Sequence, residues 1–444
     1  MKNIKLSKLW DSLHSSYWFV PTIMAISAIA LAVTMLTLDR TGASKAIAKL
    51  GWIYTGGADG ARSLLSSVAG SIISVAATSF SITIVALQLA ASNFGPRILR
   101  NFMRDTGNQV VLGTFIGTFS YCLLVLRTIH GEGDGYSVFV PQLAVTVGIV
   151  LALASIGVLI YFIHHAATII QASHVISEIS ADLNDAIDRL FPEKIGHGAS
   201  QHKRSFGEIP ANFDAEACPI KATNSGYIQA IDDEKLMKLA CQQNLLLRLK
   251  SRPGKFVVKG SDLVMVFPEK LVNPKLTTQI NNTFILGNER TDQQDVEFPI
   301  KQLVEIALRA ISPAVNDPFT AIRCIDRLGA GLSHLARKDF PSPYRYDRDH
   351  NLRLIADPVT FAGLTDAAFN SIRQYSTSDI AVTIRLLEAI EAIAPHTRNQ
   401  KDRAALLRHA DMIRRNSQEG LSEELDKKDV EERYQAAVGV LEQC

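Results

Sequence analysis

The sequence predicts an α-helical polytopic membrane domain with four transmembrane helices, followed by an α+β domain that we expect in the cytoplasm. Three observations support this fold class. Four apolar runs near the N-terminus are long enough to cross a hydrocarbon core of about 30 Å. From about Ser173 onward, the chain has the mixed polar composition of a water-soluble domain. Short strand patterns there alternate with amphipathic helical patterns.

The predicted spans cover residues 17–38, 64–89, 110–126 and 140–163, within a transmembrane domain of residues 1–170. The first span follows three lysines, as a signal peptide would. Its apolar run of 22 residues is longer than the roughly 7–15 residues of a cleavable signal. We therefore expect an uncleaved span. In the third span, Gly113 and Gly117 form a GxxxG pattern, which favours close contact with another helix.

Charge and cysteine content limit the partners. The 444 residues carry a net charge of +2, which gives no support for a nucleic-acid partner. The five cysteines are dispersed and contain no CxxC pair, so neither a disulfide framework nor a metal site is expected. Positive charge lies on both sides of the membrane, and the cysteine-containing polar domain decides the orientation. We expect a multi-pass protein of the bacterial inner (plasma) membrane with both termini in the cytoplasm.

The second span carries a stripe of hydroxyl side chains. These recur at intervals of four, three, four and three residues, at Ser67, Ser71, Ser74, Thr78 and Ser81. That spacing places them on one face of a helix. Such a face can line a water-filled path for ions. Alternatively, small residues let helix backbones approach closely. Both interpretations stay open at this point.

Charged side chains are absent from all four predicted spans, whereas ion-coupled transporters usually carry one near mid-membrane. His164 and His165 lie at the inner end of the fourth span, either as interfacial polar residues or as a pH sensor. Between the second and third spans, Arg97, Arg100 and Arg104 share one face of a predicted surface helix. They would lie at anionic headgroups or, in an oligomer, around an inner vestibule.

The soluble part has three predicted regions. Residues 171–215 continue a helix that spans 161–189 and then become a linker at 196–210. Residues 216–270 form a small β-rich, barrel-like subdomain, with strands at 226–231 and 246–249 and a helix at 233–243. The pattern is similar to half of a biotinyl/lipoyl-like barrel, but it lacks the turn that holds a carrier lysine. Residues 271–444 are expected to be mostly helical, beginning with helices at 296–310 and 318–337.

Two Asp-Pro-x-Thr sequences precede predicted helices, at Asp317 and at Asp357. Aspartate is a good N-cap and proline a good first helical residue, so capping explains both. A second interpretation joins polar residues into a cytoplasmic ligand site. The residues of that candidate site are Arg290, Asp295, Asn316, Asp317 and Thr320.

Three stretches resemble a known family. They are the segment from Ser79 to Arg97, Gly287-Asn-Glu-Arg-Thr, and Ser312-Pro-Ala-Val-Asn-Asp-Pro. Together they resemble the bacterial predicted membrane proteins of domain-of-unknown-function family 2254 (DUF2254). The resemblance covers nearly the whole chain. It implies four spans in the inner membrane, and it brings no reaction, substrate or catalytic residue.

No phosphate-binding loop, HExxH zinc motif or GxSxG nucleophile motif is present. We therefore expect no catalytic residue, cofactor or metal. The leading hypothesis is a homo-oligomeric, channel-like protein in the lipid bilayer, with a cytoplasmic assembly or gating domain. The alternative is a membrane-anchored sensor or scaffold whose soluble domain binds a small ligand or a protein partner. The sequence leaves both open.

Overall fold

The computed structural model describes residues 16–41, 53–95, 102–103, 105–132, 137–169, 171–191 and 209–443. These fall into two compact units, residues 1–174 and 175–444. The predicted linker at 196–210 lies almost entirely outside the described residues.

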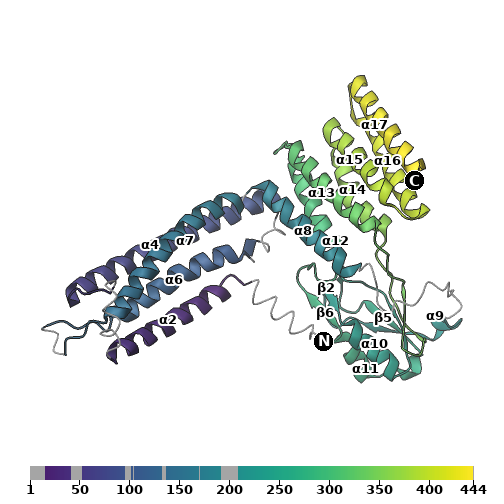
Figure 1. The fold of residues 1–444 in the computed structure, drawn as a ribbon. Helices are drawn as coiled ribbons and strands as arrows, with labels where there is room; N and C mark the ends of the chain where they lie inside the picture. The colour runs from purple at the N-terminus through teal and green to yellow at the C-terminus, as the bar shows by residue number, and fades with distance from the viewer. Residues whose placement is uncertain are drawn as a thin grey trace. The chain divides into compact units, whose positions relative to one another are not determined.

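The first unit contains four helices long and apolar enough to cross a membrane (Figure 1). They are α2 (Phe19–Arg40), α4 (Ala58–Phe94), α6 (Thr106–Leu126) and α7 (Gln142–Ile169). Each contains or nearly coincides with one predicted span, so the prediction of four long apolar helices at these positions is confirmed. Since α4 has 37 residues, it is about 55 Å long and exceeds the hydrocarbon thickness.

Helix α6 is central in this unit, because it contacts α2, α4 and α7. Half of its most apolar stretch is buried, against 11–22% for the other three helices. The GxxxG prediction is confirmed at the contact with α2. A Cβ added at Gly113 would lie 2.5 Å from Met24 Sδ, and one at Gly117 would lie 3.3 Å from Ala28 Cβ. A side chain at Gly113 would displace Met24, and one at Gly117 would make an unusually tight contact with Ala28.

The predicted continuous helix over 161–189 is interrupted. Helix α7 ends at Ile169, and α8 (Ala172–Leu190) begins after Gln171, whose N–H bonds to the carbonyl of Thr168. The apolar periodicity of the two segments did not reveal the break. Helix α8 is strongly amphipathic and buries Ile179, Leu183 and Ile187.

The second unit begins its β structure at Cys218. Its first elements are α9 (Phe213–Glu216), β1 (Cys218–Lys221), β2 (Gly226–Ile231), α10 (Asp233–Gln242), β3 (Leu246–Leu249), β4 (Phe256–Val257), β5 (Asp262–Phe267), a 3-10 turn (Glu269–Leu271), α11 (Pro274–Asn281) and β6 (Phe284–Gly287). The predicted bounds of β2, α10 and β3 agree with these to within one residue.

The remaining elements are mainly helices. They are α12 (Glu297–Ala310), α13 (Pro318–Ala336), β7 (Tyr344–Tyr346), β8 (Leu352–Ile355), α14 (Phe361–Tyr375), α15 (Ile380–Ile393), a 3-10 turn (Ala394–His396), α16 (Gln400–Gly420) and α17 (Glu424–Gln443). Helices α12 and α13 match their predictions closely. Among the last five helices, α13 packs on α15, α14 packs on α16, and α17 packs on both α15 and α16 (Figure 1).

The strands form two sheets, in the orders β1-β5-β3-β8-β7 and β4-β2-β6. All neighbours are antiparallel except β3 and β8, which pair in parallel with Leu247 opposite Leu354. The first sheet therefore takes two strands, and the second sheet one strand, from beyond residue 270. These three strands lie where the sequence predicted mostly helix. Residues 216–270 do not form a sheet of their own, and the barrel-like expectation is not confirmed.

The second Asp-Pro-x-Thr sequence does not repeat the first. Helix α14 begins at Phe361, and its N-cap is Thr360, whose hydroxyl accepts from Gly363 N at 3.1 Å. Asp357 and Pro358 thus lie between the end of β8 at Ile355 and the start of the helix. The prediction of Asp357 as the cap was wrong, because the helix begins three residues later than Pro358 and the Thr360 side chain accepts the hydrogen bond at its start.

Candidate functional site

The hydroxyl stripe of α4 lies on the outer surface of the four helices of this unit. Ser67, Ser71, Ser74, Thr78 and Ser81 are all exposed. Three of these hydroxyls donate to the carbonyl four residues earlier in the same helix: Ser74 to Gly70 at 2.9 Å, Thr78 to Ser74 at 3.0 Å and Ser81 to Ala77 at 2.9 Å. They need no further partner, yet they give that face a polar surface.

The opposite face of α4 makes the contacts within the unit. Ala69, Ile72 and Ala76 are buried there, and α4 packs against α6 and α7. Small alanines, and not the hydroxyl residues, thus provide the close approach to these neighbours. The packing interpretation of the stripe therefore does not apply to the contacts of α4 with α6 and α7.

Of the two histidines, His165 has a defined partner. Its Nε2 lies 2.7 Å from Asp105 Oδ2, and its ring stacks on Tyr161 at 5.2 Å between centroids. Asp105 also caps α6, because its carboxylate accepts from the N–H groups of Gly107 and Asn108. His165 therefore ties α7 to the start of α6. His164 is exposed.

Arg97, Arg100 and Arg104 lie outside the described residues. Their predicted role at the membrane surface or in a vestibule stays a prediction.

The five polar residues of the candidate cytoplasmic site form two separate groups. In the first, Arg290 donates from Nε (2.9 Å) and Nη2 (2.6 Å) to Asp295 Oδ2. Asp295 Oδ1 accepts from Glu297 N at 3.2 Å. Both oxygens of this buried carboxylate are thus occupied within the chain. Burial raises the pKa of Asp295, although the charge of Arg290 opposes the change.

The second group is a helix cap. Asp317 accepts from the backbone N–H of Thr320 at 3.1 Å and from its hydroxyl at 2.6 Å, and Pro318 opens α13. The backbone of Asn316 is in the left-handed region, with φ of 52°. The N–H of Asp317 bonds to the carbonyl of Ala310, at the end of α12. This confirms the capping interpretation for Asp317.

Helix α12 separates the two groups. Asp295 precedes its first residue and Asp317 follows its last. A helix of 14 residues is about 20 Å long, so the five residues do not line one small ligand site. The structure brings together Arg290 and Asp295, and separately Asp317 and Thr320.

The motif of residues 287–295 stabilises β2. The side-chain amide of Gln294 accepts from the N–H of Ile231 at 2.9 Å and donates to its carbonyl at 3.1 Å, as a neighbouring strand would. Gln229 of β2 donates to the carbonyl of Glu289 at 2.9 Å. These contacts give the segment a structural role.

Sequence reasoning missed Asp39, at the end of α2. Its buried carboxylate accepts from Leu143 N at 3.1 Å and from Ala144 N at 2.9 Å, and so caps the start of α7. At the same end of the helices, Arg62 donates to the carbonyl of Ile129 at 2.9 Å. The sequence contained one signal that a distant residue caps α7. The fourth span has no capping residue before Gln142, so a cap from elsewhere in the chain was required.

Within the described ranges, no three His, Cys, Asp or Glu side chains are grouped so that they could hold a metal ion.

Comparison with known proteins places the chain in a family. It is 32% identical over 422 residues to the uncharacterized proteins Mb1321c of Mycobacterium bovis and Rv1290c of Mycobacterium tuberculosis, an alignment that covers 94% of this chain and 79% of each relative. No solved structure is detectably similar. The family described as "Predicted membrane protein (DUF2254)" matches residues 14–392. The chain therefore belongs to the DUF2254 family of predicted membrane proteins.

Proposed function

We propose that this protein is a homo-oligomeric, channel-like protein of the bacterial inner membrane, in which α4 of each copy lines a shared path. One observation carries the proposal. The hydroxyl face of α4 points away from α2, α6 and α7, opposite the face that packs. Although these hydroxyls bond back to their own helix, together they form a continuous surface that water can wet, as a water-filled path requires.

The path needs more than one copy. Four helices are too few to enclose a wide pore, and here they pack around α6 with the stripe outside. The predicted spans contain no charged residue, which favours passive conduction over ion-coupled transport. The proposal includes no catalytic step.

In this proposal both termini and the second unit lie in the cytoplasm, where the second unit assembles or gates the oligomer. Arg97, Arg100 and Arg104 would then lie on the cytoplasmic side of the membrane. The alternative, an anchored sensor or scaffold, receives less support. Asp295 and Asp317, the carboxylates proposed for its ligand site, have partners inside the chain.

Cysteine accessibility tests the proposal, in a variant that lacks the five native cysteines. Cysteine is placed at Ser74 or Thr78 and, as the matched control, at Ile73. Ile73 is 40% exposed in the single chain, so the fold does not protect it. In the proposed oligomer, water reaches Ser74 and Thr78 but does not reach Ile73. We expect a small charged thiol reagent to modify the first two positions in membranes and to leave the third unmodified.

Conductance of the reconstituted, folded protein in planar bilayers is the companion measurement, and modification at Thr78 should reduce it. Equal protection of Ser74, Thr78 and Ile73, together with no conductance over a broad range of ions, would contradict the channel. The stripe would then be a helix-association surface, as the anchor hypothesis expects.

A further inference from the structure

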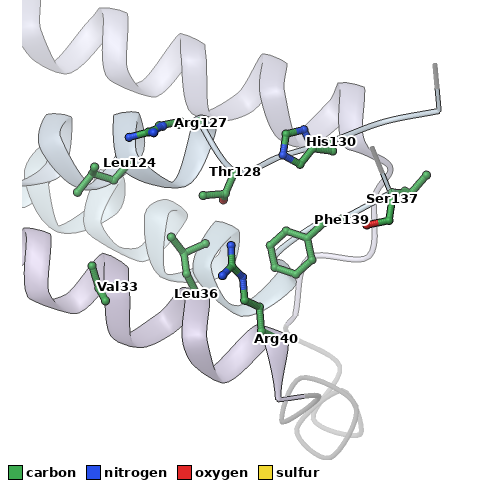
Figure 2. Close-up of a pocket in the computed structure, with 10 residues that line it drawn as sticks. Val33, Leu36, Arg40, Leu124, Arg127, Thr128, His130, Ser137 and Phe139 are labelled. Atoms are coloured by element: carbon green, nitrogen blue, oxygen red, sulfur yellow. The ribbon is translucent and has the colours of Figure 1, made fainter. Parts of the chain in front are cut away.

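A pocket of about 670 Å³ lies between the ends of α2 and α6. This volume falls within the roughly 300–1,000 Å³ typical of ligand sites. Figure 2 shows side chains from both helices and from the following segment around it. Its lining residues are Val33, Leu36, Arg40, Leu124, Arg127, Thr128, His130, Ser137, Val138 and Phe139.

The pocket changes from apolar to cationic along both helices. On α2, Val33 and Leu36 precede Arg40, and the spacing of three and four residues keeps them on one face. On α6, Leu124 precedes Arg127 at the helix end. Each arginine therefore lies about one turn nearer the end of the helices than the apolar side chain before it. A phospholipid has the same gradient, from acyl chain to phosphate.

Among the described residues, no carboxylate neutralises the positive charge of the pocket. No aspartate or glutamate is among the lining residues, and no described carboxylate forms an ion pair with Arg40 or Arg127. Arg40 lies over the ring of Phe139, 5.8 Å from its centroid. Asp39 is adjacent in sequence, but its carboxylate faces the start of α7, where it accepts two backbone hydrogen bonds.

We propose that this pocket binds an anionic phospholipid. Its phosphate lies between Arg40 and Arg127, where guanidinium groups form charge-assisted hydrogen bonds to phosphate oxygens. An acyl chain lies along Leu36 and Leu124. Free phosphate has no group to cover this apolar part. The inference goes beyond the proposed function, because a channel and an anchor could each carry such a site.

Native mass spectrometry of the full-length protein in detergent tests the site, by titration with phosphatidylglycerol or phosphatidylcholine. The wild type is expected to bind phosphatidylglycerol more tightly. The Arg40→Gln/Arg127→Gln variant should lose roughly 30-fold in affinity, about fivefold for each arginine near a membrane surface. Arg62→Gln is the matched control. It removes a positive charge at the same end of the helices, outside the pocket, and should retain the preference.

Two further variants separate the contribution of the positive charges from that of the apolar part of the pocket. Arg40→Lys/Arg127→Lys keeps both charges and should retain much of the binding, which guards against loss through misfolding. Leu124→Trp fills the apolar part and should weaken lipid binding with no change of charge. The proposal is overturned if the glutamine variant binds phosphatidylglycerol like the wild type, or if Arg62→Gln weakens binding equally. It is also overturned if inorganic phosphate alone protects the protein from thermal unfolding through the same arginines while phosphatidylglycerol does not bind.

Discussion

Gly331 of α13 faces Leu183 of α8 at a distance that leaves no room for a methyl group. A Cβ added there would lie 2.6 Å from Leu183 Cδ2 and 3.3 Å from its Cγ. Optimal contact between carbon atoms is about 3.5–4.0 Å. Leu183 is 1% exposed, so its side chain cannot move into solvent. Gly331→Ala should therefore displace α8 from α13 or force Leu183 from its rotamer.

Two effects of opposite sign set the magnitude. Overpacking a core position costs about 1–3 kcal/mol. Replacing a helical glycine by alanine returns up to about 1 kcal/mol. Gly439 of α17 provides the matched control, because a Cβ added there meets nothing within 4 Å. The difference between the two variants isolates the overlap, so Gly331→Ala should be less stable than Gly439→Ala by about 1–3 kcal/mol.

Thermal unfolding of the full-length protein in detergent, at one scan rate, measures this difference. We expect a midpoint for Gly331→Ala that is roughly 3–8 °C below that of Gly439→Ala. Adding Leu183→Ala to Gly331→Ala should cost less than the sum of the single changes, because the smaller side chain removes the overlap. The reasoning is refuted if Gly331→Ala unfolds at or above the midpoint of Gly439→Ala, or if the two changes are additive.

Two further predictions concern ion pairs of the second unit. Hydrogen bonds from Arg353 and Asn351 outweigh burial and hold the pKa of Asp347 to about 2. Its contribution, on the order of 2 kcal/mol, should be present above pH 4 and lost as the pH falls toward 2. An acid titration of unfolding checks this, and Asp347→Asn should remove that part of the pH dependence. Asp295→Ala should cost about 3 kcal/mol, because Arg290 keeps only Glu297 at 3.6 Å. Urea unfolding should show partial recovery when Arg290→Met is added, and no recovery would contradict a charge effect.

Local patterns were sufficient for the individual elements. An apolar run of span length predicts a membrane helix, because every backbone polar group in lipid must be bonded within the segment. The bounds of β2, α10 and β3 followed from alternation, helical periodicity and turn residues within a few positions of each element. The Asp317-Pro318 cap was predictable for the same reason, because its donor and acceptor are three residues apart.

Contacts between distant residues were not predictable in this way. Leu247 pairs with Leu354 across more than 100 residues, and Asp39 caps a helix that begins near Gln142. No periodicity within either segment specifies such a partner. The five residues of the candidate cytoplasmic site looked like one group because all are polar and close in sequence. The length of α12 separates them in space.

The sequence by itself determined the four long apolar helices, the bounds of β2, α10, β3, α12 and α13, and the existence of a hydroxyl face on α4, because each depends on the spacing of residues along one element. Only the tertiary structure decided that this face points away from α2, α6 and α7, and that Arg40 and Arg127 line one pocket. The physical reason is that spacing fixes which residues share a face of a helix, whereas packing against other helices fixes where that face points.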